Sequence, residues 1–458
     1  MNSTYNKIRL TLTSENSLNL LLNHLAVVYA FFLPINYEGY ARSFIFSLMV
    51  IFIIIRKNYK YYFIKSFKNP IAISFLAYTL IYYIWLIGTD DTKHAYYILH
   101  YIKVGLYPIL FYTFLDAKFT KRIITALILG VMVSELLSYL IFFKAIPLTY
   151  YISNINFPWK HNLSTITFYE AKSILDPIPF MSHEIYTPLL ALIVTILIYN
   201  FITYKSTIKF KFISIFFILT MTTNIFITGG RMGYLIFFIL ISSMLFISSI
   251  KITKNKLLFI FLFLFSVFTI AYNYSTIFKS RVQYTIKSSK EINTNHLNFS
   301  SSAGVRLGLW YYSIDKIKER PFFGYGTGDQ MLVLKSNIKD KDKHLKKMPT
   351  MHNQYFELLL QFGFIGLIVY LNLLFQIFRY NTNSKEYNDI KLYILIMIFM
   401  VSLTSPLYYF FVAFLSFTIP VITAENNIIK DKIKPLNVKT ILYYLLFIIF
   451  CYIYQEIQ

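Results

Sequence analysis

The sequence predicts an all-α, polytopic integral membrane protein with about 12 or 13 transmembrane helices and a large, partly helical periplasmic loop. Of its 458 residues, 57% are hydrophobic and only 14% are charged. Uncharged apolar runs of about 20 residues, long enough to cross a bilayer as a helix, recur along the chain. Short clusters of Lys and Arg separate these runs, which is typical of multi-pass membrane proteins. A soluble protein of this length would not need so much apolar surface.

Apolar spans lie on both sides of one large polar region. They are expected near residues 19–35, 43–55, 70–88, 95–115, 123–143, 185–203, 212–228, 232–250, 257–274, 354–377, 390–405, 406–423 and 439–456. The 43–55 span and the break at Pro406 decide between 12 and 13 helices. The chain therefore divides into N-terminal transmembrane helices (1–274), a large loop (275–353) and C-terminal transmembrane helices (354–458).

Loop charge predicts the orientation, because Lys and Arg resist translocation and accumulate on the cytoplasmic side. Alternate loops are strongly basic, whereas the short loops between them hold only Arg42, Lys93 and Arg231. Lys7 and Arg9 place the N-terminus inside. The loops at 144–184 and 275–353 are then expected outside, which in a bacterium means the periplasm or the outer face of the membrane. The basic loops carry Arg56, Lys57, Lys60, Lys65 and Lys68; Lys118, Lys121 and Arg122; Lys205, Lys209 and Lys211; Lys251, Lys254 and Lys256; Arg379, Lys385 and Lys391; and Lys430, Lys432, Lys434 and Lys439.

Composition also excludes some partners and sites. The formal charge of +23 would suit nucleic acid, but the cations sit between apolar runs, where they set topology, so we expect a lipid bilayer and no nucleic acid as partner. The single cysteine, Cys451, allows no intrachain disulfide and argues against a structural zinc site. We expect no metal and no cofactor.

Few charges fall inside the predicted spans. Lys103 and Glu135 lie at comparable depth on neighbouring spans, so they are expected to pair. A proton path through this pair, as in a transporter, is the alternative. His24 and His100 are expected to make helix–helix contacts.

The TGGRMG turn at 228–233 supplies the first candidate site residue, Arg231. Two glycines allow a tight turn, and Arg231 follows them at the outer end of the next helix. A guanidinium and the free N–H groups of a helix start together suit an anion. A glycine turn with an arginine reaching to the membrane surface has the same pattern.

The polar region 301–353 supplies two further candidates. Residues 301–318 predict an amphipathic helix that carries Arg306, and Pro321 ends it. His352 immediately precedes the next span, where a neutral imidazole could take a proton from a sugar hydroxyl and Glu357 could bias its tautomer. One His and two Arg residues would then lie on the same outer face.

Other features of this region have simpler interpretations. The glycines Gly324, Gly326 and Gly328 follow no strand, so they predict a flexible turn rather than a nucleotide site. Asp340 and Asp342 resemble a metal-binding DxD motif, but the lysines between them favour a solvated loop, and His344 is interpreted in the same way.

The loop at 144–184 is expected to cover the membrane interface, with Trp159 at headgroup level. His183 and Glu184 lie at the mouth of the following span. They either face the site or are simply the polar residues that helix mouths commonly carry.

Three motifs, in this order and on one side, resemble the O-antigen ligase family of bacterial membrane glycosyltransferases, which includes related polysaccharide polymerases. They are TGGRMG, R-x-x-x-W followed by P-x-x-G-x-G, and H-N-x-x-x-x-x-L-x-x-x-G-x-x-G-L. The resemblance covers residues 228–371 and, beyond them, only the topology. Gly230 departs from it, since Ser is common there.

The resemblance implies transfer of a glycan from undecaprenyl diphosphate to a sugar hydroxyl, at the periplasmic side of the inner membrane. Arg231 and Arg306 would hold the diphosphate and His352 would act as base. The matched motifs also make Trp310 and Asn353, with His183 at the helix mouth, expected substrate-binding residues. The acceptor would be lipid A core in a ligase, or a second carrier-linked glycan in a polymerase. A glycolipid flippase is the alternative from another class, but the sequence shows no internal repeat to support it.

Overall fold

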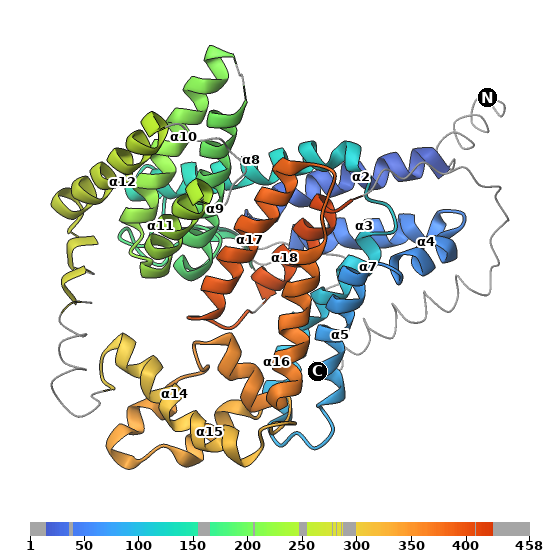
Figure 1. Ribbon diagram of the computed structural model, residues 1–458, viewed down its shortest axis with the longest axis vertical. Coiled ribbons are helices and arrows are strands. Elements are labelled where there is room, and N and C mark those ends of the chain that lie inside the picture. Colours follow the sequence, from blue (N-terminus) through green and yellow to red (C-terminus); the bar gives the residue numbers. More distant parts are fainter. Residues whose placement is uncertain are drawn as a thin grey trace.

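The computed structural model describes residues 15–35, 40–153, 165–204, 207–246, 254–276, 278–280, 282–284, 286, 299–407 and 409–424. These residues are almost entirely helical, and this confirms the all-α prediction (Figure 1). The N-terminal helices and the hairpin strands are α2 (Glu15–Phe32), α3 (Tyr40–Ile55), α4 (Tyr59–Ser66), α5 (Pro70–Ile84), α6 (Thr92–Ile102), η1 (Lys103–Leu106), α7 (Tyr107–Phe111), α8 (Ala117–Phe142), β1 (Thr149–Ser153), β2 (Thr165–Glu170), α9 (His183–Thr203), α10 (Ile208–Ile227), α11 (Arg231–Phe246) and α12 (Lys254–Tyr274). The remaining elements are α14 (Ser302–Glu319), α15 (Gln330–Asn337), η2 (Asp340–Lys347), α16 (Gln354–Arg379), α17 (Lys385–Ser402) and α18 (Tyr409–Ile422).

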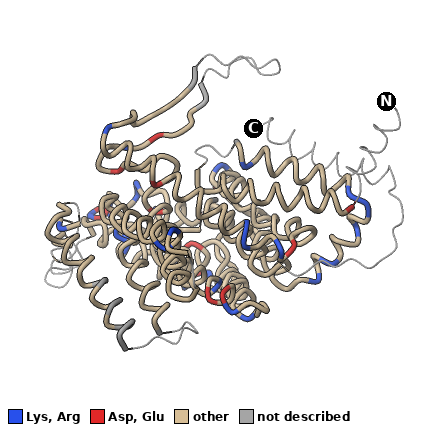
Figure 2. Tube along the Cα trace, turned by 90° about the horizontal axis from the view of Figure 1, so that it is seen from above, with Lys and Arg blue, Asp and Glu red and all other residues tan. Residues whose placement is uncertain are grey.

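Four of the described helices, α8, α9, α10 and α16, are long and apolar enough to cross a membrane. The helices α3, α5, α11 and α18 are apolar but shorter. Charged residues occur only in short stretches along the chain (Figure 2). The expected last span at 439–456, with Cys451, lies outside the described residues.

The expected span at 95–115 is not one helix. It is divided into α6, η1 and α7. Gly105 lies in η1 so close to α5 that a Cβ there would be 2.3 Å from Thr79 Oγ1. Pro108 follows at the start of α7 and supplies no N–H to a continuing α-helix. The apolar run is therefore divided where Gly105 packs against Thr79 and where Pro108 lacks a backbone N–H donor.

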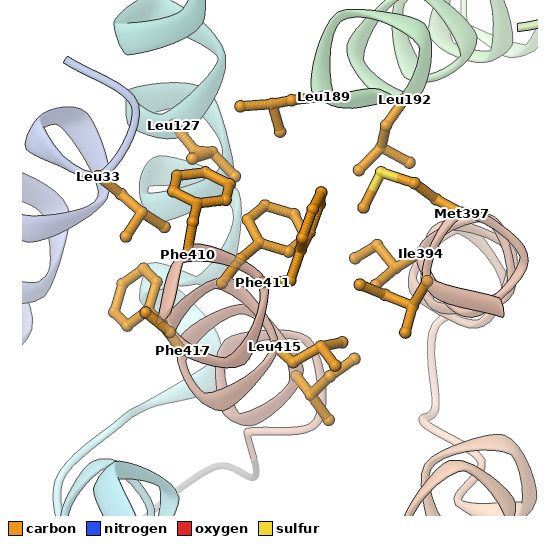
Figure 3. Close-up of a cluster of buried hydrophobic side chains, with 14 of the residues drawn as sticks. Leu33, Leu127, Leu189, Leu192, Ile394, Met397, Phe410, Phe411, Leu415 and Phe417 are labelled. Carbon is orange, nitrogen blue, oxygen red and sulfur yellow. The ribbon is translucent and has the colours of Figure 1, made fainter. Parts of the chain in front are cut away.

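The hydrophobic core is centred on α18. Its phenylalanines, including Phe410, Phe411 and Phe417, lie among side chains from α8, α9 and α17 (Figure 3). Leu33, just after α2, and Leu127 of α8 approach the same cluster. The C-terminal helix is thus enclosed by N-terminal helices, and the two predicted transmembrane parts form one packed unit.

The predicted pair between Lys103 and Glu135 does not form. Lys103 Nζ lies 3.5 Å from His100 Nδ1, because the chain turns at η1. Glu135 is fully buried in α8, and its carboxylate oxygens have no hydrogen-bond partner among the described residues. Of the two histidines, His24 makes the expected contact, edge-on to Phe119 of α8 at 5.3 Å, whereas His100 is exposed.

The loop at 144–184 contains an antiparallel hairpin that was not predicted. The strands β1 and β2 pair from Thr149↔Glu170 to Ser153↔Thr165. Their sequences, TYYIS and TITFYE, consist largely of the β-branched and aromatic residues that favour strands. Trp159 lies between them, outside the described residues.

The region 299–353 folds as a helical layer at one end of the molecule, where Figure 1 shows α14 and α15 beside the end of α16. It has its own small core, in which Leu309, Leu334, Leu345 and Met351 are fully buried. A compact layer with its own core can hold side chains at fixed positions above the membrane helices.

The glycine-rich turn after α14 is not flexible, contrary to the prediction. Helix α16 breaks at Gly363, which has φ +62°. The turn supplies partners to the broken helix: Phe364 N–H donates to the Pro321 carbonyl at 2.7 Å, and Tyr325 N–H donates to the Leu360 carbonyl at 2.9 Å. A Cβ on Gly324 would lie 2.4 Å from the Gln361 carbonyl carbon. These glycines allow the backbone of the turn to contact the backbone of α16, and the hydrogen bonds between them hold the layer against α16.

Candidate functional site

Two arginines from distant parts of the chain share one hydroxyl group. Arg231, the first residue of α11, donates to Ser302 Oγ at 2.7 Å. Arg306, one turn into α14, donates to the same Oγ at 3.1 Å and to the Ser302 carbonyl at 3.1 Å. The two guanidinium groups therefore converge where α11 and α14 both begin.

Close packing on α9 fixes the start of α11. Gly229 has φ +70° and makes the turn out of α10. A Cβ on Gly230 would lie 2.6 Å from Thr187 Oγ1, and one on Gly233 would lie 2.3 Å from the same atom. Only glycine permits this approach. Arg231 is consequently held against the first turn of α9, which carries Glu184.

The start of α14 is fixed by a cap. Ser301 Oγ accepts a hydrogen bond from Gly304 N–H at 3.0 Å, as N-cap serines do. Arg306 then points inward, and its Nε is buried without a hydrogen-bond partner among the described residues. Burial lowers the pKa of Arg306, and the Glu184 carboxylate partly opposes this. A buried guanidinium donor without an acceptor favours an incoming anion.

His352 occupies a strained turn before α16, with φ +50°. Three neighbours hold its backbone. Trp310 Nε1 donates to the Met351 carbonyl at 3.1 Å, and Glu357 Oε1 accepts from Met351 N–H at 2.8 Å. Asn353 caps α16 by accepting from the N–H groups of Tyr355 and Phe356. Non-glycine residues with positive φ persist only where the surroundings enforce them.

The charge environment keeps the imidazole neutral. Burial lowers the pKa of His352, the nearby Arg306 cation lowers it further, and the Glu184 carboxylate raises it. A neutral imidazole can accept a proton near pH 7. The same two charged groups act on His352 and on each other, so Glu184, Arg306 and His352 form one electrostatic unit.

His183 lies at the edge of this arrangement. Its Nδ1 is 3.4 Å from Asp176 Oδ2 in the outer loop, and 38% of its side chain is exposed. No described contact joins it to either arginine, so its role in substrate binding stays a prediction.

Comparison with known proteins shows which family the segment around these residues resembles. Residues 216–371 match the model of the family described as O-Antigen ligase. This segment, about a third of the chain, is therefore similar to the O-antigen ligase family. The match contains Arg231, Arg306 and His352, and it confirms the resemblance that the three motifs indicated.

The chain also resembles several individual proteins. Proteins of Rickettsia conorii and Rickettsia felis, both carrying the name "Putative polysaccharide ligase", are 26% identical over 103 residues, which is 22% of this chain and 25% of theirs. An uncharacterized protein of Haemophilus influenzae is 28% identical over 189 residues, 40% of this chain and 46% of its own. The chain thus spans between a quarter and a half of the length of these relatives.

Within the matched segment, several polar residues make hydrogen bonds that support the local structure. Trp310 and Asn353 hold the turn that carries His352, and their substrate contacts stay predictions. Asp342 accepts a hydrogen bond from the Tyr312 hydroxyl at 2.5 Å, and His344 Nε2 lies 3.0 Å from the Phe299 carbonyl. Across the part of the chain that the structure describes, no group of three or more His, Cys, Asp and Glu side chains could hold a metal ion.

Ser302 is the site residue that sequence reasoning missed. It follows the N-cap Ser301 directly, at the start of the predicted helix 301–318, of which only Arg306 was singled out as a candidate. A second hydroxyl next to a cap, one turn before a functional arginine, is the signal that could have identified it.

Proposed function

We propose that the protein is an O-antigen ligase-like glycosyltransferase of the bacterial inner (cytoplasmic) membrane. It transfers a glycan from undecaprenyl diphosphate to a sugar hydroxyl of lipid A core on the periplasmic side. The shared contact of Arg231 and Arg306 with Ser302 carries the proposal, because it brings together two fixed cations near a half-buried histidine. The family match and the names of the Rickettsia proteins support the same class of activity.

The arginines bind the diphosphate of the donor. A lipid diphosphate carries several negative charges at the membrane surface, and guanidinium groups bind phosphate oxygens in a bidentate manner. The charge on the diphosphate increases as the glycan leaves, so fixed cations stabilise the transition state more than the ground state. In this arrangement the diphosphate oxygens compete with Ser302 Oγ for both guanidinium groups.

His352 activates the acceptor. Its imidazole takes the proton of the acceptor hydroxyl while the hydroxyl oxygen forms a bond to the anomeric carbon of the glycan. The bond between that carbon and the diphosphate oxygen breaks, and its electron pair leaves with undecaprenyl diphosphate. The proton then passes from the imidazolium to solvent, which regenerates the base.

Substitution of Arg306 tests the arginine role. Arg306→Ala should lower glycan transfer about 100-fold or more, as removal of a transition-state donor does. Arg306→Lys keeps the charge but loses the planar fork, so it should restore transfer only in part. The matched control is Arg320→Ala on the same layer, where the guanidinium is exposed and lies 4.8 Å from the centre of the Tyr325 ring. Normal transfer by correctly expressed Arg306→Ala would remove Arg306 from the mechanism.

Deletion of the gene distinguishes a ligase, whose acceptor is lipid A core, from a polymerase, whose acceptor is a carrier-linked glycan. Loss of all polymeric glycan from lipid A, with carrier-linked polymer still accumulating, is the result expected for a ligase. A lipopolysaccharide ladder that collapses to one repeat unit would instead identify a polymerase. Transport of the carrier without any glycan transfer would contradict both.

A further inference from the structure

The layer above the membrane helices carries an exposed set of lysines that the proposed mechanism does not use. We call Lys335, Lys339, Lys341, Lys343 and Lys347 the lysine face, and all five are exposed. They lie on the outer end of α15, in the connection after it, and along η2. The positive-inside preference does not explain them, since long loops cross the membrane largely regardless of their charge.

The lysine face has a rigid support. Leu345, in the middle of η2, is fully buried in the small core of the layer. The Tyr312 hydroxyl binds Asp342, and Asn337 Nδ2 donates to the Tyr312 carbonyl at 2.8 Å. Because Leu345 and Asp342 point inward, the lysines interleaved with them are directed outward.

The charge of this face is not balanced within the described part of the chain. The ion pairs there join His183 to Asp176 and Lys316 to Glu319, and neither involves the lysine face. Asp340, exposed between Lys339 and Lys341, offsets one of the five positive charges, and the buried Asp342 accepts a hydrogen bond from Tyr312, so an excess of positive charge remains. Several like charges on one short element repel one another, and an external polyanion would relieve that repulsion.

The lysine face ends close in the sequence to His352, the proposed base. Lys347 lies five residues before His352, so even extended chain would separate them by roughly 17 Å. A saccharide bound at Lys347 is therefore close enough to present a hydroxyl to His352. The two arginines already bind the donor, which leaves the acceptor for this surface.

We infer that the lysine face binds phosphate groups on the saccharide acceptor and thereby holds the acceptor hydroxyl at His352. The inference rests on the proposed function. Lysine suits this task because its ammonium group is a compact point charge that binds phosphate without demanding one geometry. The acceptor is accordingly a phosphorylated saccharide rather than a neutral one.

Acceptor kinetics test the inference. Full-length protein in phosphatidylcholine vesicles would receive carrier-linked glycan and lipid A core saccharide, either native or treated with phosphatase. The variant K339Q/K341Q/K343Q/K347Q should raise the KM for the native acceptor about tenfold and leave kcat within about twofold, since each exposed ion pair contributes modestly. With the dephosphorylated acceptor, variant and wild type should have the same KM.

The matched control is K60Q/K118Q/K121Q/K209Q, which removes as many exposed lysines from loops expected on the cytoplasmic side. It should leave both KM values unchanged. An equal loss by the lysine-face variant with both acceptors, or an unchanged KM for the native one, would overturn the inference. Absence of transfer by the wild-type protein to either acceptor would instead refute the proposed function.

Discussion

At the scale of single residues, charge and burial decide the properties of the site. His352 is held in a left-handed backbone conformation by hydrogen bonds of Trp310, Glu357 and Asn353 with the surrounding backbone. These three residues can therefore affect transfer by positioning His352, without any contact with the substrate. Glu357 was expected to orient the imidazole, but its carboxylate accepts from the Met351 backbone instead. The carboxylate that acts on the pKa of His352 is instead that of Glu184, from the start of α9, which raises it.

The pH profile of glycan transfer should reflect His352. Its pKa lies below the ordinary value, so the neutral base is present at pH 7, and kcat/KM should fall only as the pH drops through that lowered pKa. Glu184→Gln removes the one charge that raises this pKa. The acid limb of the profile should consequently move to lower pH.

Glu319→Gln is the control for this change, because Glu319 is exposed and bound to Lys316 on the far end of α14. The acid limb of the kcat/KM profile of Glu319→Gln should stay at the pH of the wild-type protein. A limb that moves to higher pH in Glu184→Gln would contradict the electrostatic coupling between Glu184 and His352.

At the scale of elements, helix starts rather than helix bodies build the site. The first turns of α9, α11 and α14 meet, and the turn before α16 carries His352 toward Arg306. Glycine makes the closest of these contacts possible, since Gly230, just before α11, and Gly233 in its first turn lie directly against Thr187 of α9.

Gly230→Ala should separate α11 from α9. Its Cβ would meet Thr187 Oγ1 at 2.6 Å and Cγ2 at 3.0 Å, so we expect a loss of about 1–3 kcal/mol in the free energy of unfolding and weaker transfer, as overpacking produces. Thr187→Ala removes both colliding atoms. The double variant should therefore recover most of the melting temperature measured in detergent.

This double-mutant cycle isolates the contact between the two residues. Additive losses in Gly230→Ala and Thr187→Ala would show that the close approach of α11 to α9 does not determine stability.

At the scale of the whole molecule, topology determines where the chemistry takes place. We propose three parts, with transmembrane helices in 1–274 and 354–458 and an outer layer in 275–353. The described helices of the first and last parts pack around α18 as one body. The positions of the basic loops predict that the layer lies on the periplasmic side.

Cysteine labelling tests this orientation. In a Cys451→Ser background, Lys341→Cys should react with a membrane-impermeant maleimide in spheroplasts. Lys209→Cys should react only after the membrane is permeabilised. Both lysines are exposed in the structure, so a difference in labelling reports the side of the membrane and not burial. The reverse pattern would place the proposed active site in the cytoplasm.

The sequence by itself determined the fold class and most helices, and it predicted the three principal candidate site residues. Apolar length and loop charge are local properties, and each follows from the preference of short segments for lipid or water. The positions of Arg231, Arg306 and His352 were predictable because each lies next to a helix start, which is a local signal.

Only the tertiary structure decided how those residues meet. Ser302 joins Arg231 across 71 residues, Glu184 acts on Arg306 and His352 from another helix, and the glycine turn fastens to the break in α16. The 95–115 span is likewise divided into three helices at the point where Gly105 packs against Thr79 of α5. These features depend on contacts between distant segments, and no periodicity or composition of either segment specifies its partner.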